Sequence, residues 1–330
     1  MSEYASADHA QEVTRDLSAR QEESAQRVRQ ERIGAACLKR TRAFGKLILF
    51  GEHFVVYKAP ALVGAVAAYT DCDVEFTGAP GIEVVDLRPA VPGYKVEKAA
   101  EGEEAVKIVL SHLGVDTEKR GAKITFGGSL TAVSGIGASA AQVVSLARAL
   151  SAALPRTLSE EEVNAAGYEG EKGYHGTPSG VDNTAATYGG VLRFQRTDGA
   201  PRFAAKELAE LVVGDVKAKK EADEAWFGSL LARYTALAAE GEAALDAGDM
   251  AALGRLLDEN HALCQELTVS CKELDDLVVA ARGAGAVGAK MSGTGRGGLM
   301  LALTPTAESQ AAVAKALEKL APQVWMTTFA

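Results

Sequence analysis

The feature that most constrains this chain is a glycine-rich turn that leads straight into an apolar helix. Residues 133–141 read Val-Ser-Gly-Ile-Gly-Ala-Ser-Ala-Ala, and an apolar stretch of helical length continues to about residue 153. Glycine at 135 and 137 lets the main chain adopt positive φ and approach an anion closely, so that successive N–H groups point at one cluster of oxygens. The positive end of the helix dipole faces the same point. The segment therefore predicts a phosphate cradle, although a glycine N-cap on a buried helix explains the same residues.

The other glycine patterns of the chain exclude two common types of phosphate-binding site. The chain contains no Gly-Lys-Ser or Gly-Lys-Thr, which excludes the P-loop nucleoside triphosphatases. Residues 283–288 and 293–298 both satisfy Gly-x-Gly-x-x-Gly. Neither opens a helix after an N-terminal strand, so the pattern does not indicate a dinucleotide site. The small residues at 293–298 fit either a tight hairpin between two strands or a loop that packs against a neighbouring phosphate loop.

Polar residues lie at both ends of a short apolar run upstream of this turn. Residues 47–50 read Leu-Ile-Leu-Phe, which has the length of a buried strand. Lys46 comes directly before the run, and Gly51, Glu52 and His53 come directly after it. The sequence thus predicts a strand that carries polar groups at its two ends.

A third segment, downstream of the turn, combines polar groups with residues that break regular structure. Residues 171–183 read Glu-Lys-Gly-Tyr-His-Gly-Thr-Pro-Ser-Gly-Val-Asp-Asn. Because glycine and proline alternate through its centre, we expect a stiff loop, and not a helix, to position Glu171 and Asp182. Loops of this kind often carry catalytic residues.

These three segments, with a fourth at residues 290–298, resemble the GHMP kinase superfamily and within it the mevalonate kinases. Residues 45–56 look like the first motif of that family, residues 134–141 resemble its phosphate-binding motif, and residues 175–183 resemble its catalytic loop. Galactokinases instead follow Gly-Glu-His with Thr-Asp-Tyr, and homoserine kinases lack Gly-Glu-His. The resemblance extends over roughly residues 41 to 330, and it is strongest to enzymes of trypanosomatid type.

The resemblance implies an α+β GHMP kinase fold with two lobes. The N-terminal lobe is expected to be ribosomal-protein-S5-like, and the C-terminal lobe to be of split βαβ, ferredoxin-like type. The periodicity predicts the following elements in the second half of the chain: a strand at 211–213, three helical segments between 222 and 282 broken at 248 and near 270, strands at 287–291 and 299–303, a helix at 307–320 and a strand at 324–328.

The chain divides into three regions by composition. Residues 1–40 are polar and form no apolar face, which predicts a disordered or loosely helical extension. We expect residues 41–195 to form the ATP-binding and catalytic lobe, and residues 196–330 to form the C-terminal GHMP lobe.

Phosphoryl transfer from ATP to an alcohol requires groups that position the reactants and neutralise charge. Asp182 is the candidate base for the hydroxyl proton, and Lys46 would stabilise the developing alkoxide while keeping Asp182 ionised. A structural ion pair between the two is the simpler alternative. Mg²⁺ prefers hard oxygen ligands, and the resemblance implies that Ser139 and Glu171 supply them. His175 is expected to brace the loop.

The resemblance also assigns the binding residues. ATP is assigned to Ser134, Gly135, Ile136, Gly137, Ala138, Ser139 and Ala140. Mevalonate is assigned to Lys46, Glu52, His53, Thr177, Ser179, Gly180 and Asp182. The implied reaction is Mg-ATP-dependent phosphorylation of the 5-hydroxyl of mevalonate, a step in isoprenoid and sterol precursor synthesis.

Two departures from the family pattern keep alternatives open. Phe44 stands where the first motif usually has proline, and residues 213–220 are short and lack threonine where related kinases carry a longer loop with threonines. Another GHMP small-molecule kinase is one alternative. A catalytically silent homologue that binds ATP or isoprenoid diphosphates is the other.

Composition limits the partners and the compartment. The net charge of −9 and the lack of a basic stripe argue against nucleic acid, and no apolar run reaches membrane-spanning length. The four cysteines show no Cys-x-x-Cys pairing, so we expect reduced thiols and no disulfide framework or zinc site. We further expect a cytoplasmic protein that is a monomer or a homodimer. The trypanosomatid likeness raises a peroxisome-like organelle as a second compartment, but the final residues Thr-Thr-Phe-Ala are not the Ser-Lys-Leu address.

Overall fold

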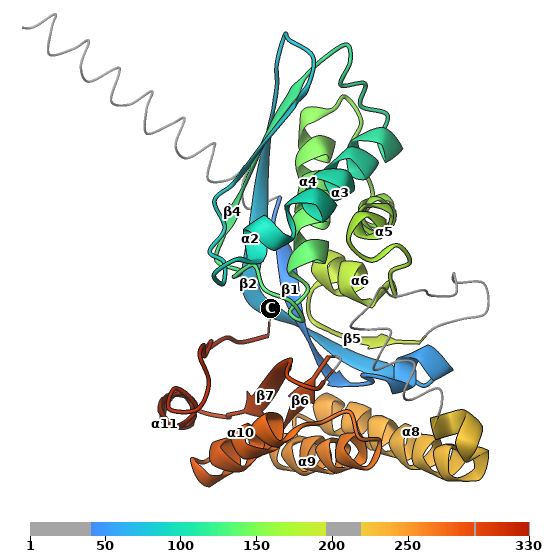
Figure 1. Cartoon of the computed structure of the whole chain (residues 1–330), viewed down its shortest axis with the longest axis vertical. Helices are drawn as coiled ribbons and strands as arrows, with labels where there is room; N and C mark the ends of the chain where they lie inside the picture. The colour runs from blue at the N-terminus through green and yellow to red at the C-terminus, as the bar shows by residue number, and fades with distance from the viewer. Residues whose placement is uncertain (1–40, 196–218, 294, 330) are drawn as a thin grey trace, which may run out of the picture.

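The computed structural model describes residues 41–195, 219–293 and 295–329, and within them the chain forms two lobes. Figure 1 shows the first lobe as a sheet with its helices on one face, and the second as a layer of helices beneath a small hairpin. The boundary predicted between residues 195 and 196 falls beside an undescribed segment and stays a prediction. No helix in the described parts of the chain is both long and apolar enough to cross a bilayer.

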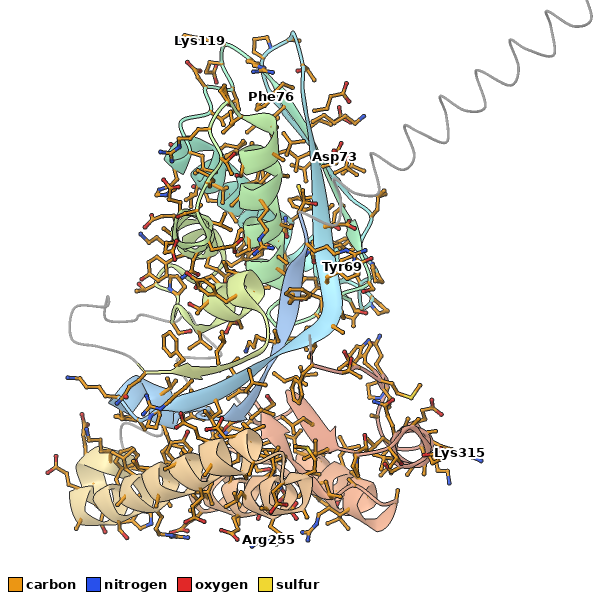
Figure 2. All side chains as sticks on the ribbon, turned by 180° about the vertical axis from the view of Figure 1, so that it is seen from behind. Tyr69, Asp73, Phe76, Lys119, Arg255 and Lys315 are labelled. Carbon is orange, nitrogen blue, oxygen red and sulfur yellow. The ribbon has the colours of Figure 1, made fainter. Side chains whose placement is uncertain are left out.

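The first lobe is built on a mixed five-stranded sheet. Its strands are β1 (Ala43–Phe50), β2 (Ala61–Phe76), β3 (Ile82–Asp86), β4 (Ala122–Gly128) and β5 (Val191–Phe194). Their order is β1-β2-β4-β3, with β5 also paired to β2, and only the β3–β4 pair is parallel. The long strand β2 runs through both ends of the lobe; Tyr69, Asp73 and Phe76 mark its course in Figure 2. Because β1 and β5 both pair with β2, their positions relative to each other are fixed by this one strand.

Helices cover one face of this sheet. The helical elements of the lobe are the 3-10 helix η1 (Phe54–Tyr57), α2 (Tyr94–Glu97), α3 (Ala99–His112), α4 (Ala138–Ala153), α5 (Glu160–His175) and α6 (Val181–Tyr188). Of these, α4 and α6 pack directly on the sheet, and α3 and α5 pack against α4. The central helix α4 is buried along most of its length, as its apolar composition on all sides predicts. Gly170 lets α5 approach α4, since a Cβ there would lie 2.8 Å from Val143. The start of α4 is therefore held firmly within the lobe.

The second lobe contains three long helices and a hairpin. Its elements are α8 (Glu224–Asp246), α9 (Met250–Glu266), α10 (Lys272–Gly283), β6 (Gly288–Ser292), β7 (Leu299–Leu303) and α11 (Ala307–Leu317). The predicted breaks between the helices are confirmed. The side chain of Asp249 caps the start of α9 directly after Gly248, which has φ of 65°.

One hydrophobic cluster joins the two lobes. Leu49 and Phe50 of β1 pack with residues of α8, α9 and β6 in a single core. The rings of Phe54 and Tyr234 stack with centroids 4.2 Å apart, and the Tyr234 hydroxyl donates a hydrogen bond to the Pro60 carbonyl at 2.6 Å. The end of β1, where the sequence places its first polar motif, is thus fixed by both lobes.

The strand predicted at residues 324–328 is wrong. After α11 the chain returns to the first lobe, where Figure 1 shows the C-terminus beside β2. The Ala67 N–H donates to the Thr328 carbonyl at 2.7 Å, and Phe329 pairs with Val66 as an isolated bridge. Gly64 makes room for this contact, because a Cβ there would lie 2.3 Å from the Phe329 ring. Three further predictions concern residues outside the described parts of the chain: the polar extension at 1–40, the strand at 211–213 and most of the short loop at 213–220.

Candidate active site

The predicted phosphate cradle lies directly against β1. The Lys46 N–H donates to the Ile136 carbonyl at 2.8 Å. A Cβ at Gly45 would lie 3.0 Å from that same carbonyl oxygen, so glycine at this position lets the cradle approach the strand. Gly137 has φ of 73°, and a Cβ there would lie 2.9 Å from Cγ of Lys46. The backbone of the cradle and the Lys46 side chain therefore touch.

The first N–H groups of α4 have no acceptor from a capping side chain. The N-cap residue is Gly137, no side chain bonds to the helix start, and the first turn carries no acidic residue. By contrast, α5 begins with a Ser159–Glu162 capping box and three glutamates in its first turn. A helix start without a cap or a carboxylate leaves its N–H groups and its positive dipole end for an external anion. This contrast favours the phosphate site over a simple structural N-cap.

Lys46 and Asp182 form the predicted ion pair. The Lys46 Nζ lies 3.3 Å from Asp182 Oδ1, and the side chains are 5% and 26% exposed, respectively. Asp182 stands in the first turn of α6, whose N-cap is Gly180 with φ of 81°. The positive end of α6 stabilises the carboxylate at this position.

The expectation that a loop positions Glu171 and Asp182 is wrong. Glu171 lies in the last turns of α5, and Asp182 lies in the first turn of α6, so the loop comprises only residues 176–180. Glycine and proline end one helix here and begin the next, and do not produce a long irregular segment. Both carboxylates are therefore held by helices.

Glu171 is a buried carboxyl group with an unusual environment. Its Oε1 atom has no hydrogen-bond partner among the described residues. Burial, followed by the nearby Asp182 charge, raises the pKa of Glu171 to about 8, while a hydrogen bond from Ser139 and the Lys46 charge act in the opposite direction. His175 Nε2 lies 3.4 Å from Ser139 Oγ and 3.9 Å from Glu171 Oε2. The fold thus brings Ser139 and Glu171 to the same point from α4 and α5.

Glu52 makes contacts that the sequence did not suggest. Its carboxylate forms an ion pair with Lys290 of β6, and both side chains are fully buried. Asn260 of α9 donates to Glu52 Oε2 at 3.3 Å. The carboxylate thus has two partners from the second lobe, while contact of Glu52 and of the buried His53 with substrate stays a prediction. The one sequence signal for this pair was a lysine within the predicted strand at residues 287–291, which the structure shows as the buried strand β6.

Residues of the loop 176–180 form hydrogen bonds to the ends of the two flanking helices, α5 and α6. The Ser179 hydroxyl accepts a hydrogen bond from the Val181 N–H at 3.2 Å, and the Thr177 N–H donates to the His175 carbonyl at 2.6 Å. The Gly180 carbonyl accepts from Thr184 Oγ1 at 2.5 Å. These bonds shape the start of α6, and contacts of Thr177, Ser179 and Gly180 with substrate stay predictions.

The glycine loop at residues 293–298 joins β6 and β7, which confirms the hairpin. The hairpin also contacts the cradle. A Cβ at Gly135 would lie 3.1 Å from Cδ1 of Leu299, the first residue of β7. The end of β6 also contacts β1, where the Ile48 N–H donates to Ser292 Oγ at 3.2 Å. The loop itself bonds to the segment after α9, where the Arg296 N–H donates to the Val269 carbonyl at 2.9 Å, and packing of the loop against the phosphate cradle stays a prediction.

Comparison with known proteins agrees with this geometry. The GHMP kinases N terminal domain model matches residues 99–190, and the GHMP kinases C terminal model matches residues 242–323. The mevalonate kinase of Thermococcus gammatolerans is 33% identical over 302 residues, covering 82% of this chain and 90% of that protein. The mevalonate kinase of Pyrococcus furiosus is 32% identical over 307 residues with the same coverage. This chain belongs to the mevalonate kinase family of GHMP kinases.

The structure of this chain is also similar to solved structures of GHMP kinases. The crystal structure of L. major mevalonate kinase in complex with R-mevalonate is 42% identical, with a TM-score of 0.82, and the match covers 88% of this chain and 94% of that one. Lactococcus lactis galactokinase, at 18% identity and a TM-score of 0.60, shares the fold alone. The GHMP fold and the resemblance to mevalonate kinases of trypanosomatid type are confirmed.

The donor set of this mevalonate kinase family member fits a magnesium ion. Ser139 and Glu171 offer hard oxygen ligands, and the unpartnered Oε1 of Glu171 is a buried oxygen that a cation would satisfy. No group of three or more His, Cys, Asp or Glu side chains suited to a metal occurs among the described residues. Magnesium would therefore take its remaining ligands from ATP phosphates and water, as it does in other kinases.

Proposed function

We propose that this chain transfers the γ-phosphoryl group of ATP to the 5-hydroxyl of mevalonate. The observation that carries the proposal is the contact between the uncapped start of α4 and the Lys46–Asp182 ion pair. An anion bound by the N–H groups of α4 lies beside a lysine and a carboxylate, the two groups that phosphoryl transfer to an alcohol requires. The curated mevalonate kinases and the L. major structure support mevalonate as the alcohol.

Each group then has a role in the transfer. Asp182 accepts the proton of the attacking hydroxyl, and Lys46 neutralises the oxygen as it becomes an alkoxide. The start of α4 binds the phosphates through main-chain N–H groups. Ser139 and Glu171 would hold Mg²⁺, which supplies charge neutralisation at the phosphate oxygens. A cytoplasmic location and a monomeric or homodimeric state stay predictions.

An ADP-release assay over several acceptors tests the proposal. We expect turnover with mevalonate, and none above background with phosphomevalonate, homoserine or galactose. Turnover with one of the other acceptors would favour a different GHMP small-molecule kinase. ATP binding without turnover on any acceptor would favour a catalytically silent homologue.

Removal of either proposed magnesium ligand should raise the magnesium requirement. Ser139→Ala and Glu171→Gln each delete or weaken one oxygen ligand, so the Mg²⁺ concentration for half-maximal turnover should rise by about tenfold or more. Ser145→Ala is the matched control, because Ser145 is a buried serine of the same helix whose hydroxyl donates to the Gln142 carbonyl at 2.9 Å, within its own helix. Unchanged magnesium titrations for both variants would place the ion elsewhere.

Substitution of Gly137 should greatly lower the affinity for ATP while the protein remains folded. A Cβ at this position adds strain of about 1 kcal/mol or more at positive φ and displaces Lys46. We expect calorimetry to show a large loss of ATP affinity for Gly137→Val in a folded protein. Gly114→Val is the control, since Gly114 has φ of 74° but no atom within 4 Å of its Cβ position. Equal ATP affinity in the two variants would contradict the cradle.

A further inference from the structure

A buried arginine outside the proposed reaction joins the elements that form the site. Arg88 follows β3 and is 5% exposed. Its NH1 atom donates to the carbonyl of Ala138, the first residue of α4, at 3.0 Å, and its NH2 atom donates to Gln142 Oε1 on the next turn at 2.7 Å. Asp86 binds the guanidinium in a bidentate manner, with distances of 3.0 Å to Nε and 2.8 Å to NH2. One side chain thus fastens the end of β3 to the helix whose N-terminus forms the cradle.

The same network reaches α5. The Tyr174 hydroxyl donates to Gln142 Oε1 at 2.6 Å, so the Gln142 oxygen accepts from Arg88 and from Tyr174 together. Tyr174 belongs to the last turn of α5, between the proposed ligand Glu171 and His175. Through Gln142, Arg88 therefore connects the start of α4 with the end of α5. These two helix ends carry the two proposed magnesium ligands.

Helix stability alone does not favour an arginine at this place. A cation near the first turn of a helix opposes the helix dipole, and burial of a guanidinium is costly unless its hydrogen bonds are satisfied. Asp86 offsets the charge, and Lys95 in turn donates to the Asp86 carbonyl at 2.7 Å. The cluster thus holds a cation that is paired with a carboxylate within hydrogen-bond distance of the helix that forms the cradle.

We infer that Arg88 is a positioning residue, which sets the start of α4 and the end of α5 in the relative position that ATP phosphates and the metal require. The inference rests on the proposed function. It depends on the planar fork of the guanidinium, which reaches the Ala138 carbonyl, Gln142 and Asp86 at once. A lysine has one ammonium group and cannot make these directed bonds together.

Calorimetry on the full chain tests this inference with Arg88→Met and Arg88→Lys. We expect both to raise the Kd for Mg-ATP by about tenfold or more, while the Kd for mevalonate stays within about twofold of the parent value. Arg148→Met is the matched control. Arg148 lies further along α4 and also holds main-chain carbonyls, those of Arg42 at 2.9 Å and Thr187 at 2.6 Å. It should lower the melting temperature without changing either Kd.

Three results would overturn the inference. Arg88→Met could bind Mg-ATP as the parent does while melting at a lower temperature, which would make Arg88 a structural brace only. Arg88→Lys could restore parent affinity, which would show that charge suffices. A parent chain that binds no Mg-ATP would overturn the proposed function and this inference with it. If Arg88→Met does not fold, Tyr174→Phe, which cuts the α5 connection alone, should still weaken Mg-ATP binding, and parent affinity in that variant would refute the network.

Discussion

Asp182→Asn should reduce kcat by about 10²- to 10⁴-fold while the Kd for ATP changes little. Asparagine has the same shape as aspartate and keeps an oxygen that can accept a hydrogen bond from Lys46, which lies 3.3 Å from Oδ1 in the parent. It cannot accept the proton of the mevalonate hydroxyl. The loss therefore concerns the transition state and not the bound substrates. Single-turnover measurements at saturating ATP and mevalonate would report this step directly.

A second carboxylate provides the control for this variant. Asp258 is a partly buried residue of the second lobe, paired with Arg282 at 3.1 Å. Asp258→Asn breaks an ion pair without touching the proposed site, so kcat should stay near the parent value. Near-parent turnover in Asp182→Asn would remove Asp182 from the mechanism and leave the Lys46–Asp182 contact as a structural ion pair.

Lys290→Met should lower the free energy of unfolding by about 3–5 kcal/mol, the usual cost of leaving one buried charge without its partner. Both members of the Glu52–Lys290 pair are fully buried, and the other side chain that donates to the carboxylate in the described part of the chain, Asn260, is neutral. The double variant Lys290→Met/Glu52→Gln should recover much of this loss, because it buries no uncompensated charge. Urea unfolding of the three proteins would measure both changes.

A lysine on the surface provides the control for Lys290→Met, because its replacement by methionine removes the same charge without leaving a buried partner. Lys272 pairs with Asp276 on the surface of α10, so Lys272→Met should leave the unfolding midpoint nearly unchanged. A similarly small effect for Lys290→Met would mean that water reaches the Glu52 carboxylate. If Glu52 also contacts mevalonate, Glu52→Gln would raise the KM for mevalonate in addition to lowering stability, because this change leaves the buried Lys290 charge without its partner.

Local features of the chain were predicted correctly from sequence because local chemistry determines them. Gly137 starts α4 with positive φ, as a glycine before an apolar helical run indicates. Breaks at Gly248 and near Ser270 separate the three helices of the second lobe, because turn and capping residues act within a few positions. The loop 176–180 shows the limit of such inference. Its glycines and proline mark a break, but they do not reveal that helices resume at once on either side.

The sequence by itself determined the residue types of the proposed site, the glycine turn and the family to which they belong. Only the tertiary structure decided which groups meet. Glu52 and Lys290 are separated by 238 positions, and Arg88 and Ala138 by 50. The Phe329 ring lies against Gly64, directly after residues 324–328, where periodicity had predicted a further strand. Such partners follow from the order of strands and the packing of two lobes on one core, and no local propensity encodes that choice.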